Sequence, residues 1–130
     1  MVCVFCELVK SRDCKVVYES VDNFAFLDFC PFKPGHVLLI PKFHKPDIHS
    51  LSEDEYASIM LDAKVISAAV QFAFKPKKVG LFILGFDVDH LHIHLVPLYE
   101  HYYLDPTGKR TSSKPSLDAA HEALLSAIGK

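Results

Sequence analysis

A strong excess of charge is absent from this chain, as are long apolar runs and internal repeats. Its 14 basic and 16 acidic residues give a formal net charge of -2, which excludes the electrostatic footprint of a protein that binds a long polyanion such as DNA. The sequence contains no stretch of about 18 apolar residues that would suggest a membrane span. Its first residues lack the basic and apolar regions of a signal peptide. The sequence therefore predicts a cytoplasmic protein without nucleic-acid or membrane partners.

The composition that is present predicts a folded domain. Half of the 130 residues are hydrophobic. A chain of this length can bury about two thirds of the surface that its unfolded form exposes. We therefore expect residues 1–130 to form a single domain. Because disulfides are rare in a reducing compartment, the four cysteines are poor disulfide candidates, and Cys3-x-x-Cys6 fits a metal half-site in a short loop or a redox pair.

Local patterns along the chain predict an α+β fold. Strands are expected where β-forming or apolar residues cluster, at residues 16–19, 24–27, 37–40, 79–84 and 91–96. A long helix is expected over residues 52–74, because Ser52 and Glu55 form a capping-box pattern and apolar residues recur behind them at helical spacing. A second helix is expected over residues 117–128. Hairpins joined to one long helix favour a mostly antiparallel sheet.

Three histidines alternate with large apolar residues in the run His90-Leu-His-Ile-His-Leu-Val-Pro97. A strand turns successive side chains to opposite faces and places like-facing residues roughly 6.5 Å apart, so the histidines would share one face and the apolar residues the other. Imidazole can attack phosphorus, move protons near neutral pH and bind metals. This face is therefore the candidate functional site.

Two metal-binding arrangements are compatible with these positions. In the first, Cys3 and Cys6 combine with His44 and His90 into a structural Cys₂His₂ zinc site, which leaves two histidines of the run for chemistry. In the second, all three histidines of the run hold a catalytic ion that activates water. The residues alone leave both arrangements open.

The run His90-Leu-His-Ile-His-Leu-Val96 resembles the signature of the histidine triad (HIT) family. The segments Cys3-Val-Phe-Cys6, Phe26-Leu-Asp28 and Gly35 to His44 are similar in order and approximate spacing to those of the family's zinc-containing bacterial branch. The resemblance covers residues 3–97 and leaves residues 98–130 as a C-terminal extension. We expect this extension either to reach a partner's site or to pack on its own domain.

The resemblance implies a fold and a set of residue roles. The implied fold is a small α+β, HIT-like domain with a mostly antiparallel five-stranded sheet, one long helix and a C-terminal helix. Such proteins usually form homodimers through the long helix and a central strand. By position, His92 matches the family's nucleophile and His94 a partner that contacts phosphate. The residues that match its zinc ligands are Cys3, Cys6, His44 and His90.

The resemblance also implies a nucleotide substrate. Asp28 matches the carboxylate that binds the ribose hydroxyls, and the positions that match the lining of the base pocket are Phe26, Leu27 and Phe29. The implied activity is hydrolysis or nucleotidyl transfer at the α-phosphate of a nucleoside phosphoramidate, a dinucleoside polyphosphate or a related nucleotide. Attack by His92 would form a covalent nucleotidyl-histidine intermediate that water then discharges, and the zinc ion would be structural.

The loop before the histidines departs from the family pattern. The family commonly has a longer loop with a Gly-Gln-Ser stretch that holds the phosphate and the leaving group, whereas this chain has Gly85-Phe-Asp-Val-Asp89. An anion near a phosphate is unfavourable unless it accepts a donor, binds a metal or turns away. We include Asp87 among the nucleotide-binding residues. For Asp89 we consider two roles, orienting His90 or protonating a departing amine.

The sequence is also compatible with two other functions, and several of its cysteines and histidines have no predicted role in the site. The unusual loop makes a nucleotide- or partner-binding module with weak catalysis a credible alternative, and a zinc-dependent hydrolase is a third hypothesis. Cys14 and Cys30 receive no role. The remaining histidines are expected to be surface or packing residues, and these are His36, His49, His101 and His121.

Overall fold

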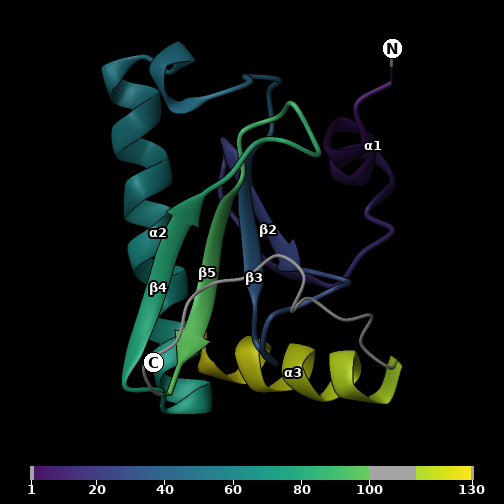
Figure 1. The fold of residues 1–130 in the computed structure, drawn as a ribbon, viewed down its shortest axis with the longest axis vertical. Helices are drawn as coiled ribbons and strands as arrows, with labels where there is room; N and C mark the ends of the chain where they lie inside the picture. Colours follow the sequence, from purple (N-terminus) through teal and green to yellow (C-terminus); the bar gives the residue numbers. More distant parts are fainter. Residues whose placement is uncertain (1, 100–113, 130) are drawn as a thin grey trace.

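The computed structural model describes residues 2–99 and 114–129, which contain a five-stranded sheet flanked by helices (Figure 1). All neighbouring strands are antiparallel, and their order across the sheet is β1-β2-β3-β5-β4. The predicted α+β fold with a five-stranded antiparallel sheet is confirmed. The strands are β1 (Val16–Glu19), β2 (Asn23–Leu27), β3 (Val37–Pro41), β4 (Lys78–Ile83) and β5 (Ile93–Leu98).

Three helices and one 3-10 turn complete the described residues. The long helix begins as predicted, because the Ser52 hydroxyl accepts a hydrogen bond from the Glu55 backbone N–H and the Glu55 carboxylate accepts one from the Ser52 backbone N–H. The C-terminal helix begins earlier than the predicted residue 117. The elements are α1 (Val4–Ser11), η1 (Ile48–Ser50), α2 (Glu53–Phe74) and α3 (Lys114–Ala127).

The short helix α1 corrects the expectation of a loop around the first two cysteines. Cys3 is its N-cap, and the Cys3 sulfur accepts a hydrogen bond from the Cys6 backbone N–H at 3.5 Å. The helix ends before Arg12, which has a left-handed conformation with φ of 58°. No ordinary start signal precedes this helix in the sequence, since cysteine is not among the preferred N-cap residues.

Different helices cover the two faces of the sheet, with α2 and α3 on one side and α1 on the other (Figure 1). The residues of β2 illustrate the division. Ala25 and Leu27 pack in the cluster that includes α2 and α3, whereas Phe24 and Phe26 pack with Phe5 of α1. Successive side chains of a strand point to opposite faces, so one strand contributes to both layers.

The strand β5 begins later than predicted. It starts at Ile93, so among the three alternating histidines only His94 lies in the paired strand, while His90 and His92 precede it. The division between faces nevertheless holds on both sides of this boundary. The apolar residues of the run that pack in the core beneath α2 are Leu91, Ile93 and Leu95.

The helix α2 is the one helix among the described residues that is long and apolar enough to cross a membrane by length and composition. Its 18-residue window has a hydropathy of 1.4, and 33% of the window is buried. This modifies the expectation that no segment has a spanning composition. Ile59, Ala63 and Ile66 of α2 pack in the sheet core, and a core helix passes the same test, so composition alone does not indicate a span.

A tight connection leads into β3. Gly35 has a φ of +95°, a conformation that favours glycine, and a Cβ atom at this position would lie 2.6 Å from Cε2 of Phe74. The chain therefore approaches the end of α2 closely before it enters the strand. The next residue, His36, is fully buried at the start of β3.

Candidate active site and metal-binding cluster

A pocket of about 350 Å³ lies on the α1 side of the sheet. Residues from α1 form one wall and the loop 84–88 between β4 and β5 forms another, and Figure 1 shows this loop rising from the sheet towards α1. The pocket is lined mainly by apolar side chains. Its ionisable lining residues among the described part of the chain are Asp28, Asp87, His92 and His94.

His92 has one ring nitrogen fixed by the backbone. Its Nδ1–H donates a hydrogen bond to the His90 carbonyl oxygen at 2.7 Å. This partner assigns the proton to Nδ1 and leaves the lone pair on Nε2, because a carbonyl can only accept. The Phe5 ring of α1 packs edge-on against the imidazole with 5.1 Å between centroids. His92 is therefore held in the tautomer that a nucleophile requires.

A second chain of hydrogen bonds fixes the tautomer of His94. The Phe32 backbone N–H donates to Nδ1 of His36 at 3.1 Å, so the proton of His36 lies on Nε2. This Nε2 lies 2.9 Å from Nδ1 of His94 and donates to it. His94 consequently carries its proton on Nε2, and its ring stacks on Phe82 with 4.5 Å between centroids. The imidazole of His94 thus offers an N–H donor at the pocket that it lines.

The role of His36 corrects the expectation of a surface or packing histidine. Its side chain is fully buried, and it links the Phe32 backbone to His94 within the site. The residue stands in the Gly35 to His44 segment that carried the family resemblance, so the signal was present in the sequence. Its contribution depends on pairing between β3 and β5, where Leu38 lies opposite His94, and this register is not readable from the sequence.

Asp28 lies just beyond the end of β2 and is buried at the pocket. Its Oδ1 accepts a hydrogen bond from the Cys30 backbone N–H at 2.9 Å, and its Oδ2 lies 3.6 Å from Nε2 of His36. Phe26 and Phe29, two of the residues predicted to bind the base, also line the pocket. The aspartate is therefore oriented by the turn that follows it and remains close to the histidine network.

Leu27 does not line the pocket, which corrects the predicted base-binding set. Its side chain is buried in the core beneath α2 and α3. The reason is the alternation along β2, which directs Phe26 to the α1 face and Leu27 to the opposite face. The matched run of residues crosses both faces, so position in a motif did not distinguish them.

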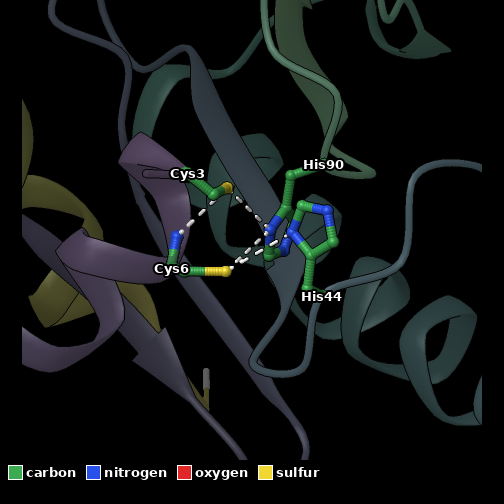
Figure 2. Close-up of side chains that lie close together, drawn as sticks. All are labelled: Cys3, Cys6, His44 and His90. Carbon is green, nitrogen blue, oxygen red and sulfur yellow. Dashed lines mark hydrogen bonds between the residues drawn. The ribbon is translucent and has the colours of Figure 1, made fainter. Parts of the chain in front are cut away.

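The four predicted zinc ligands come together at the N-terminus of α1 (Figure 2). Nδ1 of His90 lies 3.3 Å from the Cys3 sulfur and 3.5 Å from the Cys6 sulfur. Nδ1 of His44 lies 3.5 Å from the Cys6 sulfur. Ligands at the usual Zn–S and Zn–N bond lengths of a tetrahedral ion are separated by roughly 3.5 Å. The donor set and its spacing therefore fit zinc.

The protonation of His90 also fits a metal ligand. Its Nε2–H donates to the Pro41 carbonyl oxygen at 2.9 Å, which leaves the Nδ1 lone pair facing the sulfurs. Burial lowers the pKa of His90, and the neighbouring His44 and His92 lower it further. Burial raises the pKa of the Cys6 thiol, and the neighbouring Cys3 raises this pKa further. The Pro41 carbonyl thus orients the His90 ring, and the hypothesis that the exposed Asp89 does so is wrong.

The three alternating histidines have different partners. His90 belongs with the cysteines, whereas His94 lies with Asp28 and His36 in a second cluster of neighbouring ligand atoms. Nδ1 of His92 is directed to a backbone carbonyl. This arrangement favours the Cys₂His₂ site over a single ion held by all three histidines.

The remaining cysteines and histidines have different environments. Nε2 of His121 donates to the Val16 carbonyl oxygen at 2.7 Å, which ties α3 to β1 and confirms a packing role. His49 is exposed, also as expected, while His101 lies outside the described residues. Burial raises the pKa of Cys14 to about 11, so this thiol remains protonated at neutral pH.

Comparisons with known proteins agree with this fold. A model of the HIT domain family matches residues 9–101. The chain is 34% identical to adenosine 5'-monophosphoramidase of Schizosaccharomyces pombe over 103 residues, which cover 75% of this chain and 74% of that protein.

Solved structures show the same likeness in three dimensions. A HIT-like protein from Bartonella henselae matches with a TM-score of 0.87 and 25% identity, covering 97% of this chain and 96% of that one. A zinc-bound histidine triad family protein from Mycobacterium smegmatis matches with a TM-score of 0.83 and 25% identity, covering 98% and 94% of the two chains. The histidine arrangement, the family match over most of the sequence and these likenesses together show that the chain belongs to the histidine triad (HIT) family.

Proposed function

We propose that this protein is a nucleotide hydrolase that cleaves the bond between the α-phosphate of a nucleotide and its leaving group. The observation that carries the proposal is the hydrogen bond from Nδ1–H of His92 to the His90 carbonyl, which leaves the Nε2 lone pair for attack in a pocket. The phosphoramidase activity in the name of the fission-yeast relative supports the same class of reaction. The expected substrates are nucleoside phosphoramidates, with dinucleoside polyphosphates as the other candidates.

The reaction proceeds in two displacements. Nε2 of His92 forms a bond to the α-phosphorus while the bond to the leaving group breaks, and the electron pair departs with that group. Water then attacks the nucleotidyl-histidine, releasing a nucleoside monophosphate and restoring the imidazole. The Nε2–H of His94 donates to a phosphoryl oxygen in both steps and stabilises the charge that develops there.

The pocket walls supply the binding groups for the nucleotide. The buried carboxylate of Asp28 accepts hydrogen bonds from the ribose hydroxyls, since one of its oxygens is already oriented by the Cys30 N–H. Phe26 and Phe29, with Phe5 from α1, provide aromatic surface for the base. Asp87 lines the loop wall of the pocket, and we assign it to the part of the substrate beyond the phosphate.

The Cys3, Cys6, His44 and His90 cluster is proposed to hold a structural zinc ion. Bound zinc would tie the start of α1 to the chain beside β5, and it would take no part in the chemical step. Metal analysis of the purified protein tests this. One zinc per chain that is lost in Cys3→Ser and retained in His92→Asn supports the structural site, while the reverse pattern supports a catalytic ion.

The protein is further proposed to form a homodimer through α2 and, in place of the central strand expected from the family resemblance, the edge strand β4. The edge strand β4 exposes Leu81 and Ile83, and α2 exposes Tyr56 beside them, with exposed fractions of 41%, 42% and 45%. A group of exposed apolar residues beside an unpaired strand edge is a surface on which another chain can pair. Sedimentation of Leu81→Glu tests the interface, with Leu125→Glu on α3, whose leucine is 49% exposed, as the matched control.

Turnover of a substrate panel tests the proposed activity. The purified protein is incubated with adenosine phosphoramidates and dinucleoside polyphosphates, and release of nucleoside monophosphate is measured. We expect release from at least one phosphoramidate and its loss in His92→Ala. Tight mononucleotide binding without release would contradict the hydrolase and would instead identify a nucleotide-binding module.

A further inference from the structure

The charge of the candidate pocket is unusual for a site that binds phosphate. Among the described residues its lining contains two carboxylates, Asp28 and Asp87, and two imidazoles, but neither lysine nor arginine. A polyphosphate leaving group carries several negative charges and is normally neutralised by basic side chains or metal ions. The lining therefore favours a substrate that brings one phosphate and no further anion.

The two carboxylates have different surroundings. Asp28 is buried, accepts a hydrogen bond from the Cys30 backbone N–H and lies near His36. Asp87 is exposed in the loop between β4 and β5, and no ion pair joins it to another described residue. Asp28 thus belongs to the histidine network, whereas the negative charge of Asp87 remains available at the loop wall of the pocket.

An aromatic ring accompanies Asp87 at this wall. Phe86 precedes Asp87 in the loop, is 97% exposed and lines the same pocket. A phenylalanine this exposed loses hydrophobic stabilisation unless something covers it. Aromatic faces and a carboxylate together form the chemistry that recognises an organic cation, because the ring faces and the carboxylate both attract positive charge.

We propose that Asp87 and Phe86 form a leaving-group subsite that selects a cationic amine. The substrate class is then a nucleoside phosphoramidate made from one nitrogen of a diamine or of a similar molecule with a second, protonated amino group. The inference rests on the proposed hydrolase function, which it narrows from any leaving group to a positively charged one. It also gives a purpose to the two-carboxylate loop that departs from the family pattern.

The reaction balances without a further reactant except water. The P–N bond breaks as His92 attacks, and the departing nitrogen takes one proton from solvent and leaves as an amine. The second amino group stays protonated throughout and pairs with Asp87 before and after cleavage. Water then supplies the hydroxyl that completes the nucleoside monophosphate and returns its proton to solvent.

A matched series of substrates tests this subsite. Adenosine phosphoramidates of putrescine, pentylamine and δ-aminovalerate share the same chain length, but their far ends are cationic, neutral and anionic. We expect kcat/KM to be about fivefold higher for the putrescine compound than for the pentylamine compound, and about fivefold lower again for the δ-aminovalerate compound, because a solvent-exposed charge pair has this strength.

Variants assign the preference to one residue. Asp87→Asn is expected to reduce the ratio between the cationic and anionic substrates to near one, and Asp87→Lys to reverse it. The control is Asp89→Asn, which removes the same charge two residues later. Asp89 is exposed and lies outside the pocket lining, which argues against the amine-protonating role considered from the sequence, so this variant should retain the ratio. Higher salt should compress the ratio in the unmodified protein.

The outcomes separate this inference from the proposed function. Absence of turnover for all three compounds contradicts the hydrolase itself. Turnover at equal rates, or fastest for the anionic compound, overturns the cationic subsite while the hydrolase stands. A cationic preference that survives Asp87→Asn overturns the assignment to Asp87.

Discussion

The residues that alternate along the run 90–96 form two sets on opposite faces. The apolar set is expected to stabilise the fold, and the histidine set is expected to carry the chemistry. Leu91, Ile93 and Leu95 are buried in a large apolar core beneath α2 and α3. The histidines that alternate with them belong to a pocket and to the candidate metal-binding cluster beneath α1. The difference shows that neighbouring residues of the same run have separable roles. Substitutions on one face should alter the free energy of unfolding, and substitutions on the other should alter turnover or metal binding.

The layers on the two faces also differ in how they are held. The long α2 buries six residues along its length, while the eight-residue α1 buries only Phe5. A helix as short as α1 is not stable by itself in water. The stability of the α1 layer is therefore expected to depend on the candidate metal-binding cluster at the start of α1. The stability of the core layer is not expected to depend on this cluster.

The largest expected effect is the loss of turnover on replacing His92. We expect His92→Ala to lower kcat by about a thousandfold or more, because no other group supplies the nucleophile. The free energy of unfolding should change by less than about 1 kcal/mol, because the imidazole lines a pocket. Steady-state kinetics and urea unfolding of the same preparation measure both. A comparable loss of stability would contradict the division between the faces.

Substitutions on the apolar face of the run should alter the free energy of unfolding. Leu95→Ala removes a fully buried side chain and is expected to lower the free energy of unfolding by about 3 kcal/mol. The half-exposed Leu125 gives the matched control, and Leu125→Ala should cost under about 1 kcal/mol. Urea unfolding measures both variants. Equal losses would show that burial in this core does not govern stability.

The proposed zinc site predicts that removal of metal affects the α1 layer more than the core. Zinc bound at 100 times its dissociation constant stabilises the folded state by about 2.7 kcal/mol, so chelation or Cys3→Ser should lower stability by about this amount. Hydrogen exchange should increase most in α1 and least in α2. Exchange that increases evenly over both helices would contradict a local role for the cluster.

A smaller effect is expected from the buried histidine behind His94. His36→Leu removes the donor to Nδ1 of His94 and should lower kcat about tenfold with little change in KM, because His94 then loses its fixed tautomer. His36→Gln, which restores an amide donor, should recover part of the loss. If the two variants are equally impaired through KM alone, His36 acts in substrate binding and does not position His94.

The smallest expected effect is a pH dependence of the metal-free protein. Burial lowers the pKa of His90, so below about pH 6.5 the unfolded chain binds more protons at this residue than the folded protein does. Stability should therefore fall as the pH falls through 6.5 towards the lowered pKa. Urea unfolding with a chelator at several pH values measures the slope. His90→Gln should have a shallower slope, and an unchanged slope would contradict the assignment.

The sequence predicted those features that depend on local patterns. The capping box at Ser52 and Glu55 placed the start of α2, and the alternation of apolar residues placed the central strands. Local hydrogen bonding and side-chain periodicity depend on neighbouring residues, so these elements needed no tertiary information. The grouping of Cys3, Cys6, His44 and His90 was also predicted, but from the family resemblance, because its members lie up to 87 residues apart in the sequence.

Features that depend on pairing between distant segments were missed. His36 gained its role from the β3–β5 register, Leu27 was assigned to the wrong face, and α1 was hidden because a cysteine caps it. The start of β5 at Ile93 likewise depends on its partners β3 and β4. The role of His36 and the start of β5 depend on contacts across the sheet, which a single sequence does not specify. Leu27 and α1 were missed for local reasons, because a motif match does not indicate a strand face and cysteine is not a usual N-cap residue.

Mass spectrometry of the reacting protein tests the central claim most directly. The protein is mixed with an adenosine phosphoramidate, quenched in alkali to preserve the acid-labile bond between phosphorus and nitrogen, and digested at alkaline pH. We predict an adenylyl group on His92, absent from His92→Asn. An adenylyl group on His94 or His90, or turnover with no adduct on any histidine, would contradict the assignment of His92 as the nucleophile.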